Sequence, residues 1–164
     1  MPVVLLHGIG SNAHSFEPLM TALHRHYPSV AWDFPGYGQS EPLPIEAPRL
    51  AHYAVVLSHL IEHLEIKRFV LVGHSLGCLV AARYARVTPE GIAALFLISP
   101  ALGYSERKDA PLPPEVAARI TQLERLGAAK FAAKRAPAML ADPSARPDVM
   151  QAVGSNGSLM VQVP

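Results

Sequence analysis

Residues 69–77 read Phe69-Val70-Leu71-Val72-Gly73-His74-Ser75-Leu76-Gly77, and this stretch decides the fold. Its first four residues form an apolar run typical of a buried parallel strand, and a helical pattern occupies residues 76–87. Gly-x-Ser-x-Gly at such a junction indicates a turn so tight that the positions two before and two after the serine lack side chains. The turn would strain Ser75 and expose its Oγ. The pattern predicts a nucleophilic serine, and the alternative is a glycine-lined turn with an ordinary N-cap serine.

Two further glycine-containing turns follow apolar runs upstream. The run Val3–Leu6 ends at His7-Gly8-Ile9-Gly10-Ser11, and the run Val30–Trp32 ends at Asp33-Phe34-Pro35-Gly36-Tyr37-Gly38-Gln39-Ser40. Acyl-transfer chemistry needs hydrogen-bond donors aimed at a developing oxyanion, and a Gly-rich turn after a neighbouring strand supplies backbone N–H groups that no side chain blocks. Residues 7–11 are such a turn.

Helical patterns alternate with the apolar runs. Residues 16–23 carry apolar side chains at helical spacing, and a second helix of about five turns is predicted from Pro48 to Leu64. Ile92–Ile98 is predicted to be the fourth strand. Because strands and crossover helices alternate strictly, the sequence predicts an α/β fold in which a parallel sheet lies in three layers.

With these motifs the chain resembles the α/β-hydrolase fold superfamily, specifically its lid-bearing members such as enol-lactone hydrolases, carbon–carbon bond hydrolases and esterases. HGIGS, DFPGYGQS and GHSLG stand in the family's order and spacing, and the resemblance covers about residues 2–100. It implies a partial α/β-hydrolase core over residues 1–100, followed by the start of a helical lid and a tail over residues 101–164. It also implies that the first and third strands lie side by side, so that their turns meet where open α/β sheets bind ligands.

The resemblance further implies roles for individual residues. Ser75 would be the nucleophile, and the backbone N–H groups of Ile9 and Leu76 would form the oxyanion hole. The glycines that the loop and the elbow require would be Gly8, Gly73 and Gly77.

The rest of the catalytic triad is missing from the sequence. The family's acid and histidine follow the nucleophile, whereas all eight histidines here lie at or before residue 74. His74 adjoins Ser75 and is expected to point away from Oγ, and Asp109, Asp142 and Asp148 are interpreted as caps or surface charges. A serine without a neighbouring base is a weak nucleophile. The resemblance also implies further strands before the first one seen here and after the lid, so we interpret the chain as truncated at both ends and expect the 164 residues alone to be inactive.

Other residues with reactive side chains receive structural interpretations. Cys78, the single cysteine, is interpreted as a buried hydrophobe rather than a reactive thiol. Asp33 is expected to fix the turn that follows it, His7 to be a structural loop residue and Trp32 to belong to the core. No Cys/His cluster has metal spacing and no Gly-x-Gly-x-x-Gly follows the first strand, so neither a metal nor a cofactor is expected.

Composition and net charge disfavour some classes of binding partner. Fourteen Lys and Arg against 13 Asp and Glu give a net charge of +1, which favours neither nucleic acid nor an anionic membrane as partner. The longest apolar run, Ile92–Ile98, is far shorter than the ~20 residues of a transmembrane helix, and no signal-peptide pattern opens the chain. A cytoplasmic location is therefore expected. The family's strand order would place the uncharged run Ile92–Ile98 at a sheet edge, so the isolated chain is expected to self-associate or aggregate.

Two hypotheses for function remain. The leading one is a fragment of a cofactor-free serine hydrolase that cleaves an ester, lactone or activated carbon–carbon bond of a small, partly apolar substrate. The alternative is a non-catalytic α/β-hydrolase-like module that keeps the pocket for binding and has lost its triad.

Overall fold

The computed structural model describes residues 1–101, 111–142, 144 and 146–151. Its centre is a parallel four-stranded sheet of β1 (Val3–Leu6), β2 (Ser29–Trp32), β3 (Phe69–His74) and β4 (Ile92–Ile98). The strand order is β2-β1-β3-β4, so the predicted adjacency of the first and third strands is confirmed. Leu6 lies beside Gly73 in the β1–β3 register. The turns that follow these two strands therefore leave the sheet at the same edge.

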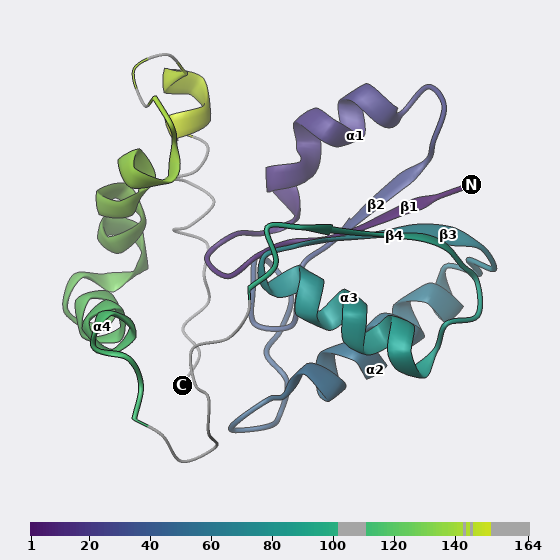
Figure 1. Cartoon of the computed structure of the whole chain (residues 1–164), viewed down its shortest axis with the longest axis horizontal. Helices are drawn as coiled ribbons and strands as arrows, with labels where there is room; N and C mark the ends of the chain where they lie inside the picture. Colours follow the sequence, from purple (N-terminus) through teal and green to yellow (C-terminus); the bar gives the residue numbers. More distant parts are fainter. Residues whose placement is uncertain (102–110, 143, 145, 152–164) are drawn as a thin grey trace.

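Helices cover both faces of the sheet and give the three layers that the sequence predicts (Figure 1). One face carries α2 (Leu50–His63) and α3 (Leu76–Val87), and the other carries the 3-10 helix η1 (Ala13–Phe16) and α1 (Glu17–Leu23). α3 packs against β1, β3, β4 and α2. This helix, which starts at the turn after β3, therefore packs against three of the four strands.

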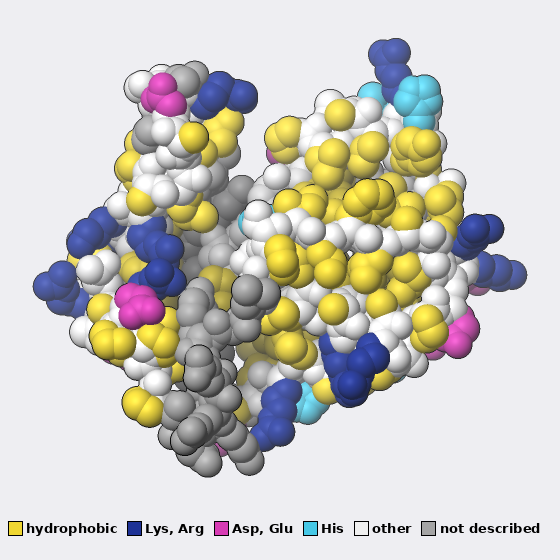
Figure 2. Space-filling model, viewed as in Figure 1, with side chains coloured by type: hydrophobic (Ala, Val, Ile, Leu, Met, Phe, Trp, Pro, Cys, Tyr) yellow, Lys and Arg dark blue, Asp and Glu magenta, His cyan; other side chains and the backbone are white. Residues whose placement is uncertain are grey.

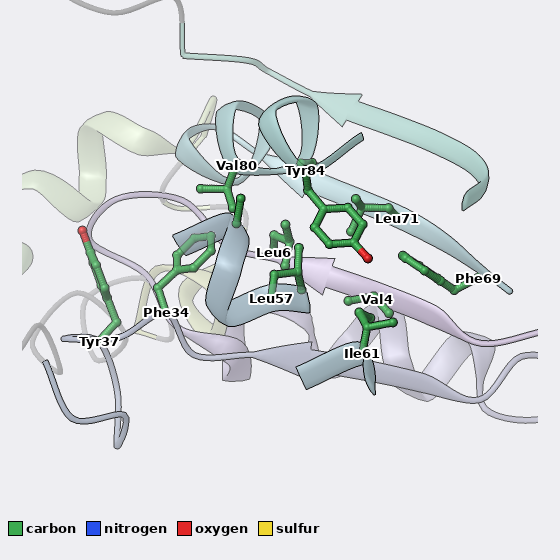
Figure 3. Packing of buried hydrophobic residues seen from close by; sticks show 12 residues of the cluster. Val4, Leu6, Phe34, Tyr37, Leu57, Ile61, Phe69, Leu71, Val80 and Tyr84 are labelled. Carbon is green, nitrogen blue, oxygen red and sulfur yellow. The ribbon is translucent and has the colours of Figure 1, made fainter. Parts of the chain in front are cut away.

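The apolar runs fill two separate cores because successive residues of a strand point to opposite faces. Val4 and Leu6 of β1 belong to the cluster under α2 and α3, whereas Val3 and Leu5 belong to the cluster on the α1 face. Figure 3 shows the larger cluster, in which β1 side chains lie between those of α2 and α3. Each such side chain stabilises the fold by about 1.5–3 kcal/mol when fully buried. A strand covered on both faces explains why no polar residue interrupts Val3–Leu6.

The second helix starts later than the sequence predicts. It begins at Leu50, so Pro48 precedes the helix and is not its first residue. Arg49 is extended, with φ −110° and ψ 163°, and its N–H donates a 3.0 Å hydrogen bond to Nδ1 of His52. This side-chain cap fixes the start of the helix at Leu50, and the helix ends at His63.

The predicted helix over residues 16–23 is divided between η1 and α1. The side chain of Asn12 accepts a hydrogen bond from the N–H of His14 at 3.0 Å and begins η1, which ends at the buried Phe16. α1 then starts at Glu17 with Pro18 in its first turn. The division leaves Leu19 39% exposed, although the apolar spacing predicts that it faces the sheet.

The edge strand β4 exposes apolar side chains at its carboxyl end. Leu95, Phe96, Leu97 and Ile98 are between 38% and 56% exposed. Figure 2 shows hydrophobic side chains gathered over this part of the core. β2 forms the opposite edge of the sheet.

The helix α4 (Pro114–Arg135) and the short helix η2 (Ala136–Met139) lie beside the core, on the side to which the carboxyl ends of the strands point (Figure 1). α4 is kinked at Gly127, where φ is 71° and ψ is 163°. Among the described helices and strands, α4 packs only against η2. Within the described residues, no helix is both long enough and apolar enough to cross a membrane.

Candidate active site

The junction between β3 and α3 holds Ser75 in a strained backbone conformation. β3 ends at His74, α3 begins at Leu76, and Ser75 between them has φ 52° and ψ −112°. A non-glycine residue with positive φ is uncommon, and such strain persists only where the surrounding structure over-determines it. Ser75 is partly buried. The strained turn that Gly-x-Ser-x-Gly predicts is present.

The two glycines of the motif are required by backbone contacts. A Cβ at Gly73 would lie 2.5 Å from the carbonyl oxygen of Gly77, and a Cβ at Gly77 would collide with the carbonyl oxygen of Leu6. Both obstacles are main-chain atoms, which cannot rotate away as a side chain can. The absence of side chains at these positions lets α3 approach β1 and β3 closely enough to form the turn.

The turn after β1 lies directly against Ser75. A Cβ at Gly8 would lie 2.9 Å from Cβ of Ser75, 3.4 Å from its Oγ and 3.2 Å from Nδ1 of His74. Ile9, the next residue, is 62% exposed. The structure therefore brings together Gly8 and Ser75, two predicted site residues that are distant in the sequence.

His7 is fully buried and joins the turns after β1 and β2. Its Nε2 accepts a 3.2 Å hydrogen bond from the N–H of Phe34, which leaves Nδ1 to donate to the carbonyl oxygen of Gly8 at 2.8 Å. Burial lowers the pKa of His7, although the bond to Gly8 and the charge of Asp33 oppose this. The neutral ring is therefore favoured, and one tautomer fits both bonds. The structural role expected for His7 is confirmed.

Asp33 fixes the turn that follows β2, as expected, and also accepts a hydrogen bond from the first residue of η1. Its carboxylate accepts hydrogen bonds from the N–H groups of Ala13 at 2.6 Å and Gln39 at 3.4 Å. Its carbonyl oxygen accepts a 2.8 Å hydrogen bond from the hydroxyl of Ser40. The long-range bond to Ala13 connects the segment after the turn at residues 7–11 to the end of β2.

Cys78 is buried one turn into α3, as predicted. Its single S–H lies within donor range of two carbonyl oxygens, that of Gly73 at 3.0 Å and that of Ile98 at 3.2 Å. Burial raises the pKa of Cys78, so its sulfur remains a protonated donor near neutral pH. The thiol therefore joins the ends of β3 and β4 beneath the serine.

The other candidate acids and bases lie elsewhere on the molecule. Asp142 accepts hydrogen bonds from Ser144, and Asp148 forms an exposed salt bridge with Arg146. Asp109 lies outside the described residues. His74 is exposed, and within the part of the chain that is described no histidine hydrogen-bonds to Oγ of Ser75. The described residues likewise contain no group of three or more His, Cys, Asp or Glu side chains placed to hold a metal ion.

The chain is similar in sequence to curated hydrolases. The chain is 37% identical over 98 residues to the pimeloyl-[acyl-carrier protein] methyl ester esterase of Proteus mirabilis, a match covering 59% of this chain and 35% of the esterase. It is 34% identical over 98 residues to a serine hydrolase-like protein of Danio rerio, a match covering 59% of this chain and 30% of that protein. The matched region thus spans about a third of these curated relatives.

The fold comparison extends over more of the chain. The enol-lactonase from Burkholderia xenovorans LB400 superposes with a TM-score of 0.82 at 20% identity, covering 99% of this chain and 61% of the lactonase. The family model described as the alpha/beta hydrolase fold matches residues 1–137, which is most of the chain. By this match, the chain belongs to the α/β-hydrolase fold family.

Proposed function

We propose that this chain carries the nucleophile and oxyanion-binding part of a serine hydrolase. The observation that carries the proposal is the strained Ser75, with φ 52°, lying against the glycine turn that follows β1. A strained strand-to-helix turn exposes a serine hydroxyl, and a neighbouring glycine-rich turn can present backbone N–H groups to the reacting oxygen without a side chain in the way. The esterase of Proteus mirabilis, at 37% identity, supports an ester as the type of bond cleaved.

The proposed reaction begins with attack by Oγ of Ser75 on a carbonyl carbon. A bond forms between Oγ and that carbon, the carbonyl π electrons move onto oxygen, and the hydroxyl proton passes to a base. The N–H groups of Ile9 and Leu76 would donate to the resulting oxyanion. Collapse of this intermediate expels the leaving group with a proton and leaves an acyl group on Ser75. Water then hydrolyses the acyl-enzyme and regenerates the serine.

The substrate we propose is small and partly apolar, with an ester, lactone or activated carbon–carbon bond. Ile9 is 62% exposed beside Gly8, and Ile98 at the end of β4 is 46% exposed. The N–H of Ser75 donates to the carbonyl of Ile98 at 3.0 Å, so this residue adjoins the serine turn. Apolar side chains around a few polar groups are typical of sites for small molecules.

The base is the part of the machinery that this sequence does not supply. All eight histidines lie at or before residue 74, and none hydrogen-bonds to Ser75 among the described residues. We propose that the histidine and the acid lie outside these 164 residues and that the chain alone is inactive. The same observation favours the second candidate function, an α/β-hydrolase-like module that retains the pocket for binding and does no chemistry.

The domain division that we propose separates a core of residues 1–100 from a helical part of residues 101–164. Support comes from α4, which packs against η2 and against no other described helix or strand. α4 also lies on the side of the molecule where the strands end, which is the position expected of a lid over Ser75 (Figure 1).

Supplying the missing base tests the proposed function. The chain is incubated with p-nitrophenyl acetate with and without added imidazole, and acetyl adducts are located by mass spectrometry. We expect an adduct on Ser75 that depends on imidazole, because imidazole can accept the hydroxyl proton that the missing histidine would otherwise take. Ser75→Ala is the control for direct reaction with imidazole. Equal nitrophenol release from the wild type and Ser75→Ala would refute the nucleophile and leave the binding module as the better hypothesis.

A further inference from the structure

The backbone of Ser75 is held on both sides by one short segment at the end of β4. The N–H of Ser75 donates to the carbonyl oxygen of Ile98 at 3.0 Å, and the N–H of Ala101 donates to the carbonyl oxygen of Ser75 at 3.3 Å. We call residues 98–101 the clamp segment. Its two hydrogen bonds reach both peptide groups that flank the Cα of Ser75, and the carbonyl oxygen of Ser75 also accepts from the N–H of Cys78 at 3.1 Å within the first turn of α3.

The thiol of Cys78 contacts the same carbonyl group of the clamp segment. Its Sγ lies 3.2 Å from the carbonyl oxygen of Ile98, the same oxygen that accepts from the N–H of Ser75. Cys78 is 1% exposed. Movement of the clamp segment away from Ser75 would also break this contact, and we expect it to make the sulfur more accessible to solvent.

A second strained residue shapes the clamp segment. Ser99 has φ 47°, and the only other non-glycine residues with positive φ in the described part of the chain are Ser75 and Glu65. Pro100 follows, and a residue before proline ordinarily adopts an extended conformation with negative φ. The conformation of Ser99 is therefore unfavourable both for its residue type and for its position.

The reversal at Ser99 explains why the clamp can form. Two residues separate the carbonyl group of Ile98 from the N–H of Ala101, and an extended strand would carry the chain straight past the turn. The left-handed backbone at Ser99, followed by the fixed φ of Pro100, bends the chain so that both groups reach Ser75. Ser99 itself is exposed, so its backbone conformation, rather than packing of its side chain, carries the effect.

We propose that Ser99 is a positioning residue for the nucleophile. Its positive φ determines the path of the clamp segment, and the hydrogen bonds of the clamp segment keep Ser75 in the strained conformation. The relevance of the clamp segment to catalysis rests on the proposed function of Ser75. The hydrogen bonds between the clamp segment and Ser75 do not depend on that function. Energetic support from outside the motif is needed because a strained residue relaxes unless its neighbours over-determine it.

The test compares Ser99→Gly with Ser99→Val and uses Cys78, the chain's only cysteine, as the reporter. Glycine adopts positive φ freely, whereas a β-branched residue there is a genuine outlier. We expect Ser99→Val to raise the reaction rate of Cys78 with an aromatic disulfide by about tenfold under native conditions, the effect of a correspondingly larger open population. Ser99→Gly should react at the wild-type rate. In amide hydrogen exchange, Ser75 and Ala101 should lose protection in Ser99→Val while Leu5 in β1 keeps it.

Glu65 provides the matched control because it is exposed and has φ 52° at the end of α2. Glu65→Gly and Glu65→Val introduce the same two residue types at a positive-φ position that is distant from Ser75 in the sequence. Both should leave the rate at which Cys78 reacts with the aromatic disulfide unchanged. The proposal is overturned if Ser99→Val leaves Cys78 and the two amides unchanged, or if Glu65→Val exposes Cys78 equally. Should Ser99→Val not fold, Ser99→Thr keeps the hydroxyl while adding the β-branch, and it is judged by the same measurements. Because none of these measurements involves an ester, their failure is distinct from failure of the imidazole experiment.

Discussion

Replacing Gly77 with alanine should destabilise the fold by pushing α3 away from the sheet. The new Cβ would collide with the carbonyl oxygen of Leu6 and lie 2.7 Å from the carbonyl carbon of Leu6 and 2.8 Å from the carbonyl oxygen of His7. Overpacking of this kind costs about 1–3 kcal/mol, and immobile backbone obstacles place it at the upper end of that range. Alanine returns about 1 kcal/mol through its better helix propensity. We therefore expect the free energy of unfolding to fall by about 2 kcal/mol, out of the ~5–15 kcal/mol typical of a domain.

Urea unfolding followed by the fluorescence of Trp32, the single tryptophan, measures this change. With a denaturant slope of about 2 kcal/mol per molar, the midpoint should fall by about 1 M. Ala82→Gly is the matched control, because it exchanges the same two residue types at an exposed position of α3 and should cost about 1 kcal/mol through propensity alone. A Gly77→Ala variant as stable as the wild type would refute the close contact between α3 and β1.

Three other predictions concern the site and the sheet edge. Burial lowers the pKa of His7 below 6.5, so below that pH the unfolded chain binds a proton on His7 more readily than the folded chain does. The contribution of His7 to the free energy of unfolding should therefore be complete above pH 6.5 and decline as the pH falls. Thermal melts of His7→Gln should show a shallower decline of the melting temperature with falling pH. Gly8→Ala, whose Cβ would lie 2.9 Å from Cβ of Ser75, should lower imidazole-dependent acylation of Ser75 by about tenfold or more while costing less stability than Gly77→Ala, and unchanged acylation would contradict the placement of this turn. Sedimentation at micromolar concentration should show self-association that Phe96→Lys weakens, since Phe96 is 56% exposed on the edge strand; a wild-type chain that sediments as a clean monomer would disprove this role of β4.

The sheet and the serine turn could be predicted because their signals are local. Val3–Leu6 and Phe69–Val72 are continuous apolar runs, and a strand buried on both faces requires that pattern whatever surrounds it. Glycine occurs at positions 73 and 77 because a Cβ at either position would clash with neighbouring backbone atoms. The order of the strands came from resemblance to a known family, since four apolar runs do not specify their own neighbours.

The long-range hydrogen bonds could not be predicted from the sequence. His7 receives the N–H of Phe34, and Asp33 receives the N–H of Ala13 across 20 residues, contacts that depend on β1 and β2 lying side by side. The start of α2 was misplaced for a related reason. His52 caps Arg49, although histidine is not among the preferred capping residues, and Pro48 therefore suggested an earlier start. The left-handed conformation of Ser99 has no sequence signal, because serine before proline ordinarily indicates an extended residue.

The geometry at Ser75 is therefore a property of the sheet rather than of the motif. The glycines let the backbones of β1, β3 and α3 approach closely, but the turn after β1 lies against one side of the serine, and the end of β4 hydrogen-bonds to both of its flanking peptide groups. Ser75 lies between β3 and α3 in the sequence, so two of its constraints come from elements that are distant along the chain. A peptide of residues 69–87 would keep every glycine of the motif and lose both of those constraints. Because strain at a non-glycine residue relaxes when its surroundings are removed, such a peptide should return Ser75 to negative φ.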